Sequence, residues 1–309
     1  MEISMSTATK PILVIGATGR HGGTGAAVAR ELRNRGLPVR AFMRNVDERA
    51  APLKALGAEI ATGDLHDRRS LKTALDGVEV AYFAYPVAGG IVDAAANFAS
   101  AGRAAGLKRV VVMSMAVSNP DSASHLGRAQ WLAEELLEWT GFSCLHLRIA
   151  ALFVENLELL HRADILGDGV IRNSFANVAL SWITGDDAGK LAVAALLHPD
   201  RFGGKAAVYP SGGDQYTHAE IASLLGRHLG RPLRHETIEK EVWRERLIAL
   251  SARDNRINID MASHISVLGA AIRQSPPAND MFEAVTGEKP LSLEKAIKTG
   301  RLSLGEQTV

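Results

Sequence analysis

Short apolar runs and helix-like stretches alternate along the first half of the chain. Six runs are almost continuously apolar and rich in β-branched residues, as strands buried on both faces of a sheet must be. Several of the stretches between them end at a glycine, a residue that can adopt the left-handed conformation closing a helix. The expected strands are Ile12–Ile15, Val39–Met43, Glu59–Thr62, Val80–Phe83, Val110–Met113 and Ser143–Leu147. The expected helices are Gly23–Arg35, Arg49–Leu56, Arg69–Leu75, Ile91–Ala105 and His125–Trp139.

This alternation is typical of repeated βαβ units and predicts an α/β fold with a doubly wound parallel sheet. Right-handed crossovers bring the carboxyl ends of all parallel strands to one edge of the sheet, where ligands bind. We therefore look for chemistry where the predicted strands end.

The second half of the chain has a different pattern. After Arg148 the alternation stops, and Asp186–Leu197, His218–Leu229 and Glu239–Leu250 are helix-like without strong strands between them. We expect a dinucleotide-binding domain over residues 1–152 and a smaller, mostly helical substrate lobe over 153–309, with some of its segments returning to the sheet.

Composition narrows the functional classes. Hydrophobic residues make up 47% of the chain, and 35 lysines and arginines balance 34 acidic residues, so no broad basic surface for nucleic acid is indicated. The N-terminal residues lack a secretory apolar stretch, and no apolar run is long enough to span a bilayer. The single cysteine, Cys144, suits a reducing cytoplasm and core packing. Ten scattered histidines without companion cysteines predict no metal site.

A glycine-rich turn follows the first predicted strand. Gly16, Gly19 and Gly22 would respectively allow a tight turn, close approach of the backbone to a pyrophosphate, and close packing of the next helix. The helix that follows would present free N–H groups to the phosphates. The cofactor contacts expected here are Gly16, Thr18, Gly19, Arg20, His21 and Gly22.

The end of the second strand indicates which dinucleotide is bound. An acidic residue there accepts hydrogen bonds from the ribose of NAD, whereas an arginine suits the 2′-phosphate of NADP. Arg44 stands at this place, and its planar guanidinium can bind phosphate with two hydrogen bonds, so NADP(H) is favoured over NAD(H). The alternatives are that Arg44 is only solvated, or that Asp47 or Glu48 folds back onto a ribose.

Two further strand ends complete the expected groove. Asp64 and Leu65 would lie beside the adenine, although Asp64 is equally suited to capping the next helix. Ala84 and Tyr85 would lie beside the ribose and phosphates.

With these residues in place, the chain resembles the NmrA-like family of atypical short-chain dehydrogenase/reductases. The resemblance rests on GATGRHGG, VRAFMR, GDLHD and VVVMSM in the first half, and on HLRIAALFVENL, WITGDDAGKLAVAALLHP and YTHAEIASLLGRHLGRP later. It implies a Rossmann domain that binds NADP(H), and a helical lobe that closes a substrate cleft. The family contains both reductases of quinones and azo dyes and regulators that do no chemistry. The resemblance also implies a position on the nicotinamide side of the cleft for Asn156, whose amide would bind cofactor or substrate.

The usual proton-donating pair of short-chain dehydrogenases, a tyrosine with a lysine four residues later, is absent from the sequence. By resemblance, Gln130 stands at the helix position where many family members carry a lysine or a histidine. A glutamine cannot act as an acid near neutral pH. An apolar stripe through Leu126 and Ala133 would place His125 and Gln130 at its two edges, bordering a cleft. His125 is then the best proton donor, and Ser114 would orient the substrate unless it serves a local backbone group.

Two functions from different classes remain. The first is an NADPH-dependent reductase that transfers hydride to a small conjugated acceptor such as a quinone, which can collect its proton from water. The second is a redox sensor that binds NADP(H) and acts through a protein partner, as the absent pair and Gln130 also allow. A homodimer or a regulatory partner is compatible with both, and isomerase or epimerase chemistry has no specific support.

Overall fold

The computed structural model describes residues 10–19, 22–302 and 304. Contacts divide the chain into two compact units, which are treated separately below. The first unit consists of Met1–Ser122, Leu126–Ile149 and Ala188–Tyr209, and the second of Ala123–His125, Ala150–Asp187 and Pro210–Val309.

The first unit is built on a seven-stranded parallel sheet with the order β10-β6-β5-β4-β1-β2-β3. The chain winds outward from β1 in one direction and from β4 in the other, which is the doubly wound topology that the alternation predicts. The strands are β1 (Ile12–Ile15), β2 (Val39–Met43), β3 (Glu59–Thr62), β4 (Val80–Phe83), β5 (Arg109–Met115), β6 (Ser143–Ile149) and β10 (Ala207–Val208). The predicted fold class is confirmed, and four of the predicted strands have their expected bounds.

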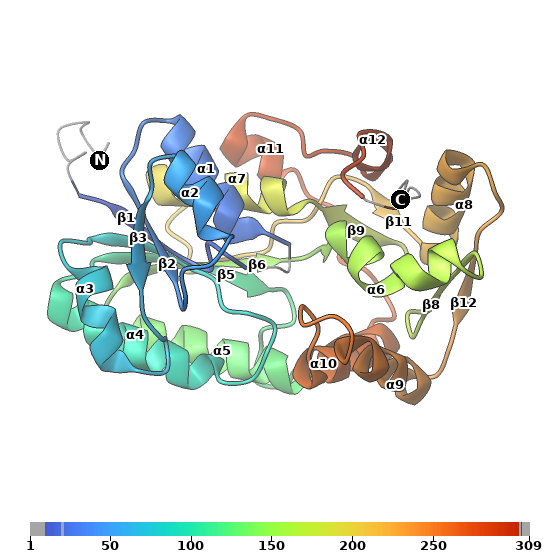
Figure 1. Ribbon diagram of the computed structural model, residues 1–309, viewed down its shortest axis with the longest axis horizontal. Helices are drawn as coiled ribbons and strands as arrows, with labels where there is room; N and C mark the ends of the chain where they lie inside the picture. The colour runs from blue at the N-terminus through green and yellow to red at the C-terminus, as the bar shows by residue number, and fades with distance from the viewer. Residues whose placement is uncertain (1–9, 20–21, 303, 305–309) are drawn as a thin grey trace. The chain divides into compact units, whose positions relative to one another are not determined.

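Helices cover both faces of this sheet (Figure 1). On one face lie α1 (Thr24–Asn34), α2 (Ala50–Ala55) and the part of α7 (Gly185–Leu197) from Ala188 onward. On the other lie α3 (Leu71–Leu75), α4 (Ile91–Ala105) and α5 (His125–Trp139). Because both faces are covered, β1 and β4 bury nearly every side chain, which is why their sequences do not alternate between apolar and polar residues.

The second unit contains two small sheets. One has the order β11-β9-β7 and the other pairs β12 with β8. The strands are β7 (Leu152–Phe153), β8 (Val170–Asn173), β9 (Leu180–Ile183), β11 (Gln215–Tyr216) and β12 (Arg234–Thr237). The helices are α6 (Glu155–Leu166), α8 (His218–Leu229), α9 (Lys240–Ser251), α10 (Ile259–Ala271), α11 (Met281–Thr286) and α12 (Leu293–Lys298). The expected helices are present, but these strands were not predicted, because they are short and, unlike the four-residue strands of the first unit, do not alternate regularly with predicted helices.

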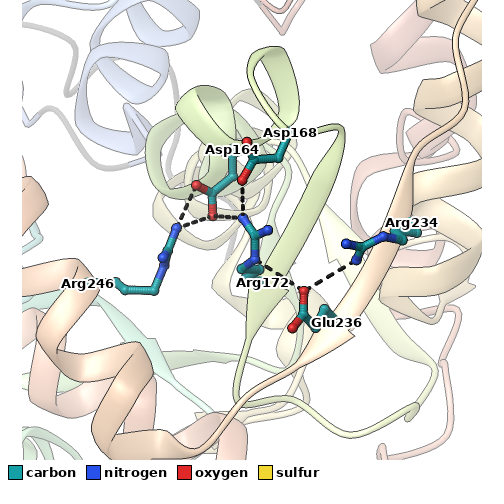
Figure 2. Close-up of polar contacts among 6 residues, drawn as sticks. All are labelled: Asp164, Asp168, Arg172, Arg234, Glu236 and Arg246. Carbon is teal, nitrogen blue, oxygen red and sulfur yellow. Dashed lines mark hydrogen bonds and ion pairs between the residues drawn. The ribbon is translucent and has the colours of Figure 1, made fainter.

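A network of charges joins α6, β8, β12 and α9 in the second unit. The guanidinium of Arg172 lies 2.9 Å from Asp168 and 3.2 Å from Glu236, and 3.6 Å from Asp164. Arg246 binds Asp164 at 2.6 Å, so that Asp164 is shared between two guanidinium groups. Figure 2 shows the six residues of this network: Asp164, Asp168, Arg172, Arg234, Glu236 and Arg246.

A cluster of aromatic and histidine rings from α6, α8, α9 and β12 lies in the same unit. The ring of His161 stacks on that of Trp243 with 5.1 Å between centroids, and His218 stacks on His235 at 5.2 Å. Burial is the main cause that lowers the pKa of His161, to about 3, and it also lowers the pKa of His218 well below its usual value. These two histidines are therefore neutral at physiological pH.

Within the residues that the structure describes, no helix combines the length and apolar character needed to cross a membrane. The described residues also contain no group of three or more histidine, cysteine, aspartate or glutamate side chains placed to hold a metal ion.

Candidate functional site

The glycine turn after β1 lies against the end of β4, at the point where the winding of the sheet reverses. Gly16 has a φ of +83°, and a Cβ atom there would lie 2.8 Å from the carbonyl oxygen of Ala84. Only glycine tolerates both conditions. The amide of Gly19 donates to the carbonyl oxygen of Gly16 at 2.9 Å, which closes the turn. Two residues of the predicted motif, Arg20 and His21, lie outside the described residues.

The first helix approaches this turn at a glycine that sequence reasoning did not single out. A Cβ atom on Gly25 would lie 2.2 Å from the carbonyl oxygen of Gly16. Close packing of the helix on the turn is thus seen at Gly25, and Gly22 has a φ of 67° in the connection. At the N-cap, Gly23, no side chain of the described residues makes a capping hydrogen bond. The N-terminus of a helix that follows such a turn is a place where an anion can bind.

Arginines occupy the ends of the neighbouring strands. Arg44, directly after β2, is 69% exposed, and its Nε lies 3.6 Å from Asp64 after β3. Arg49, which the motif search missed, donates from Nη1 to the carbonyl oxygen of Thr18 in the glycine turn at 3.1 Å. Arg49 also binds the carboxylate of Asp47, and this hydrogen bond is the main cause that raises the pKa of Arg49. Asp47, one of the two carboxylates foreseen as alternative ribose contacts, is thus paired with Arg49.

The residues expected beside the adenine and the ribose directly follow β3 and β4. Asp64 accepts from the amide of His66 at 2.9 Å, which is a turn contact. The cap of the following helix, foreseen as the alternative role of Asp64, is made by Asp67 instead. Leu65 packs partly buried against the hydrophobic core. The hydroxyl of Tyr85 lies 2.9 Å from Nε2 of His66 and donates to the carbonyl oxygen of Gly89 at 3.0 Å.

A buried ion pair lies under the carboxyl ends of β5 and β6. The carboxylate of Glu134, 1% exposed, accepts two hydrogen bonds from the guanidinium of Arg148, at 2.9 and 2.6 Å. The same carboxylate accepts from the hydroxyls of Ser114 and of Ser118. Burial disfavours the charged form of Arg148, but hydrogen bonds to Glu134 and Tyr209 outweigh it and raise the pKa of Arg148. The hydroxyl of Ser114 is thus engaged by a side chain, rather than by the backbone group foreseen as its alternative.

The buried face of α5 differs from the one expected from its apolar residues. Gln130, Ala133, Glu134 and Leu137 are buried, so Gln130 lies within the buried face and not at its edge. The apolar stripe is misleading here, because the glutamate is paired with Arg148 and can therefore be buried. Nε2 of Gln130 has no hydrogen-bond partner in the described part of the chain. This amide is the buried donor on α5 that a ligand could satisfy.

The other two predicted residues belong to the second unit. His125, at the start of α5, is half exposed, and its Nε2 lies 3.6 Å from Asp260 on α10. Asn156 is near the start of α6, and its Oδ1 is buried without a hydrogen-bond partner among the described residues. Each has a polar atom suited to a ligand, and their assigned roles stay predictions.

The sheet order, the glycine turn at its reversal point and the helix that follows the turn define a doubly wound α/β protein of the Rossmann type. The chain belongs to the NmrA-like family, whose model matches residues 8–299.

Among the proteins to which the chain is similar are two reductases and a transcriptional regulator. An NAD(P)H azoreductase from Xenophilus azovorans is 32% identical over 233 residues, which cover 74% of this chain and 78% of that protein. An NADPH-dependent quinone oxidoreductase from Escherichia coli, solved with NADPH, has a TM-score of 0.74 at 21% identity, with 93% and 99% of the two chains covered. The transcriptional regulator NmrA, solved with NADP, has a TM-score of 0.69 at 17% identity, with 94% and 95% covered. The two structural similarities establish the fold.

Proposed function

We propose that the protein is an NADPH-dependent reductase that transfers hydride to a small, flat, conjugated acceptor such as a quinone or an azo compound. The observation that carries the proposal is the glycine turn, in which Gly16 lies too close to the carbonyl oxygen of Ala84 for any side chain. Such a turn brings backbone amides to the surface where a pyrophosphate can approach them. The similarity to the azoreductase, over most of both chains, supports a nicotinamide cofactor and this class of acceptor.

The charges around the turn fit NADP(H) better than NAD(H). Arg44 is exposed at the end of β2, and its ion pair with Asp64 is long enough to be replaced by a phosphate. Arg49 adds a second positive charge beside Thr18. When bound, the cofactor would supply the hydride. The residues that would hold it are those of the glycine turn, with Arg44 and Arg49 at its 2′-phosphate.

Few of the described side chains near the candidate site could donate a proton to the acceptor. Gln130 can donate a hydrogen bond from its unpartnered Nε2 but cannot release a proton near neutral pH. His125 is the predicted donor, and its pairing with Asp260 would orient the imidazole. An acceptor whose reduced form takes its proton from water would relax the need for either residue.

Oxidation of NADPH in the presence of a panel of quinones and azo dyes tests the activity. We expect turnover with at least one acceptor, and its loss in Gly16→Val, where a side chain would collide with Ala84. Absence of turnover above background with every acceptor would overturn the proposal.

Cofactor preference has its own test. In Arg44→Ala, we expect the affinity for NADPH to fall about tenfold while that for NADH is unchanged, since a charge-assisted contact is worth about 1.5 kcal/mol or more. Arg69→Ala is the matched control, because Arg69 is another strongly exposed arginine, and it should leave both affinities unchanged. Equal losses for both dinucleotides in Arg44→Ala would contradict the assignment.

A regulator that binds NADP(H) without turnover is the second candidate, favoured by Gln130 in place of an acid. Calorimetry would then show cofactor binding, and a partner captured from native lysate would change with the oxidation state of the cofactor. Binding without turnover and with such a partner change would favour the regulator over the reductase.

A further inference from the structure

Tyr209 lies in the first unit, at the edge of the sheet formed by the carboxyl ends of the strands, where ligands bind in folds of this type. It directly follows β10, whose Val208 pairs with Leu147 of β6 in parallel register. The next position in this register places Tyr209 beside Arg148, which in turn pairs with Ser114 of β5. Ser114, Arg148 and Tyr209 therefore form one row across the carboxyl ends of three adjacent strands.

The tyrosine is exposed and yet held in place. Its side chain is 45% exposed, and Nη1 of Arg148 donates to its hydroxyl at 2.6 Å. The guanidinium carbon lies 5.6 Å from the centre of the ring. Arg148 is held in turn by the two hydrogen bonds to buried Glu134. Each member of this chain of three fixes the position of the next.

Stability alone does not explain this arrangement. Taking the charges of Glu134 and Arg148 out of water costs free energy that their mutual attraction often only just repays. An apolar pair would hold α5 against β6 at least as well. The ion pair instead fixes the orientation of the Arg148 guanidinium. The remaining donor of this guanidinium in turn orients the exposed ring of Tyr209.

The distance between Tyr209 and the glycine turn is compatible with contact to a substrate bound next to the cofactor. In the sheet order, β10 is three strand spacings from β4, or about 14 Å at about 4.8 Å per spacing. A dinucleotide bound at the glycine turn would extend along the same edge toward β5. Tyr209 then lies beyond the cofactor along this edge of the sheet.

We propose that Tyr209 is a substrate-contact residue whose ring, oriented by Glu134 and Arg148, packs against a flat conjugated acceptor. The proposal rests on the reductase function and specifies where its acceptor binds. A tyrosine suits this task, because a fixed ring offers a large contact area at little cost in conformational entropy. Glu134 and Arg148 are positioning residues, which act on the substrate through Tyr209.

Binding of the azo dye methyl red to the protein saturated with NADP⁺ tests the contact without turnover. We expect Tyr209→Ala to weaken dye binding about tenfold, or about 1.4 kcal/mol, because the variant loses its aromatic contact with the dye. Tyr209→Phe keeps the ring but loses the hydrogen bond from Arg148, and a loss of about threefold is expected. Trp139→Ala, which removes an exposed aromatic ring elsewhere on α5, is the matched control and should bind dye like the parent protein.

The affinity for NADP⁺, measured on the same variants, should not change. Unaltered dye binding by Tyr209→Ala, or no dye binding by the parent protein, would overturn the substrate contact. The reductase function is judged separately by NADPH oxidation, so its failure can be distinguished from that of the contact. If the parent protein binds dye without reducing it, a loss of dye binding in Tyr209→Ala still supports the contact.

Discussion

Two clusters of buried polar groups, one in each unit, differ in how their hydrogen bonds are satisfied. In the first unit, Glu134 and Arg148 are charged, and every oxygen of the carboxylate has a hydrogen-bond donor. In the second, His161 and His218 are neutral rings packed among aromatic residues, and Nδ1 of each has no partner among the described residues. A buried charge thus demands matched partners, whereas a neutral ring tolerates an unmatched atom. The first cluster can orient an exposed side chain, while the second is sensitive to acid.

Removing one charge should break the first cluster. Glu134→Leu leaves the guanidinium of Arg148 largely buried without its carboxylate, and we expect the free energy of unfolding to fall by about 3–5 kcal/mol. Urea denaturation measures the change. The double variant that adds Arg148→Met removes the unpaired charge and should recover most of the loss. A double variant no more stable than the single one would contradict this account of the pair.

Acid should break the second cluster. The unfolded chain binds protons at its histidines below about pH 6.5, whereas folded His161, with a pKa of about 3, does not. Stability is therefore complete above pH 6.5 and falls as the pH drops toward 3. Between pH 7.5 and 5.0, His161 alone should lower the free energy of unfolding by about 2 kcal/mol. His218 should act in the same direction.

The groups around His161 do not offset this effect, because the positive charges of Arg246 and of protonated His235 also disfavour its protonation. Urea denaturation at a series of pH values gives the slope, which should decrease in His161→Phe. His228→Gln, which replaces an exposed histidine of α8, is the control and should leave the slope unchanged. Identical slopes in the parent protein and His161→Phe would refute the neutral buried ring.

A smaller change in the free energy of unfolding is expected for Gln130. This residue lies next to the first cluster but, like the histidines of the second, has a buried atom without a partner in the described structure. It is buried beside Glu134 on α5, and its Nε2 lacks a partner in the described structure. Gln130→Leu removes an unsatisfied donor and should raise the free energy of unfolding by about 1 kcal/mol. If this donor serves a ligand, NADPH turnover should fall in the same variant. A loss of stability with unchanged turnover would assign Gln130 a structural role.

The smallest effect is expected in the charge network of the second unit. Arg246 is partly exposed and binds Asp164, which Arg172 also contacts. Arg246→Ala should cost at most about 1 kcal/mol, and the difference from the parent protein should shrink in high salt. A larger loss that is insensitive to salt would mean that this network resembles the buried pair of Glu134 and Arg148.

Sequence patterns located the elements that carry the cofactor turn because these elements are long or continuously apolar. Val39–Met43 and Ile91–Ala105 have their expected bounds, and Gly16 stands where its spacing indicates. The strands of the second unit were not predicted. They do not alternate regularly with predicted helices, and a strand such as β11 is defined by its pairing with a neighbour distant in the sequence.

The candidate site was predictable where its residues are contiguous and not where distant segments meet. The motif around Gly16 indicated the turn, but Arg49 reaches Thr18 only because α2 packs beside it. Tyr209 had no motif, since its partner Arg148 is 61 residues away in the sequence. The burial of Gln130 depended on the pairing of Glu134, which a helical projection of apolar residues does not contain.

By itself, the sequence determined the class of fold and the place of the glycine turn, because hydrophobic burial and the conformational freedom of glycine act over short stretches of chain. The tertiary structure alone decided which charges are paired, which histidines are held neutral and which tyrosine lies at the ligand edge. Those outcomes depend on burial and on hydrogen bonds between residues far apart in the chain, and neither is defined until the chain has folded.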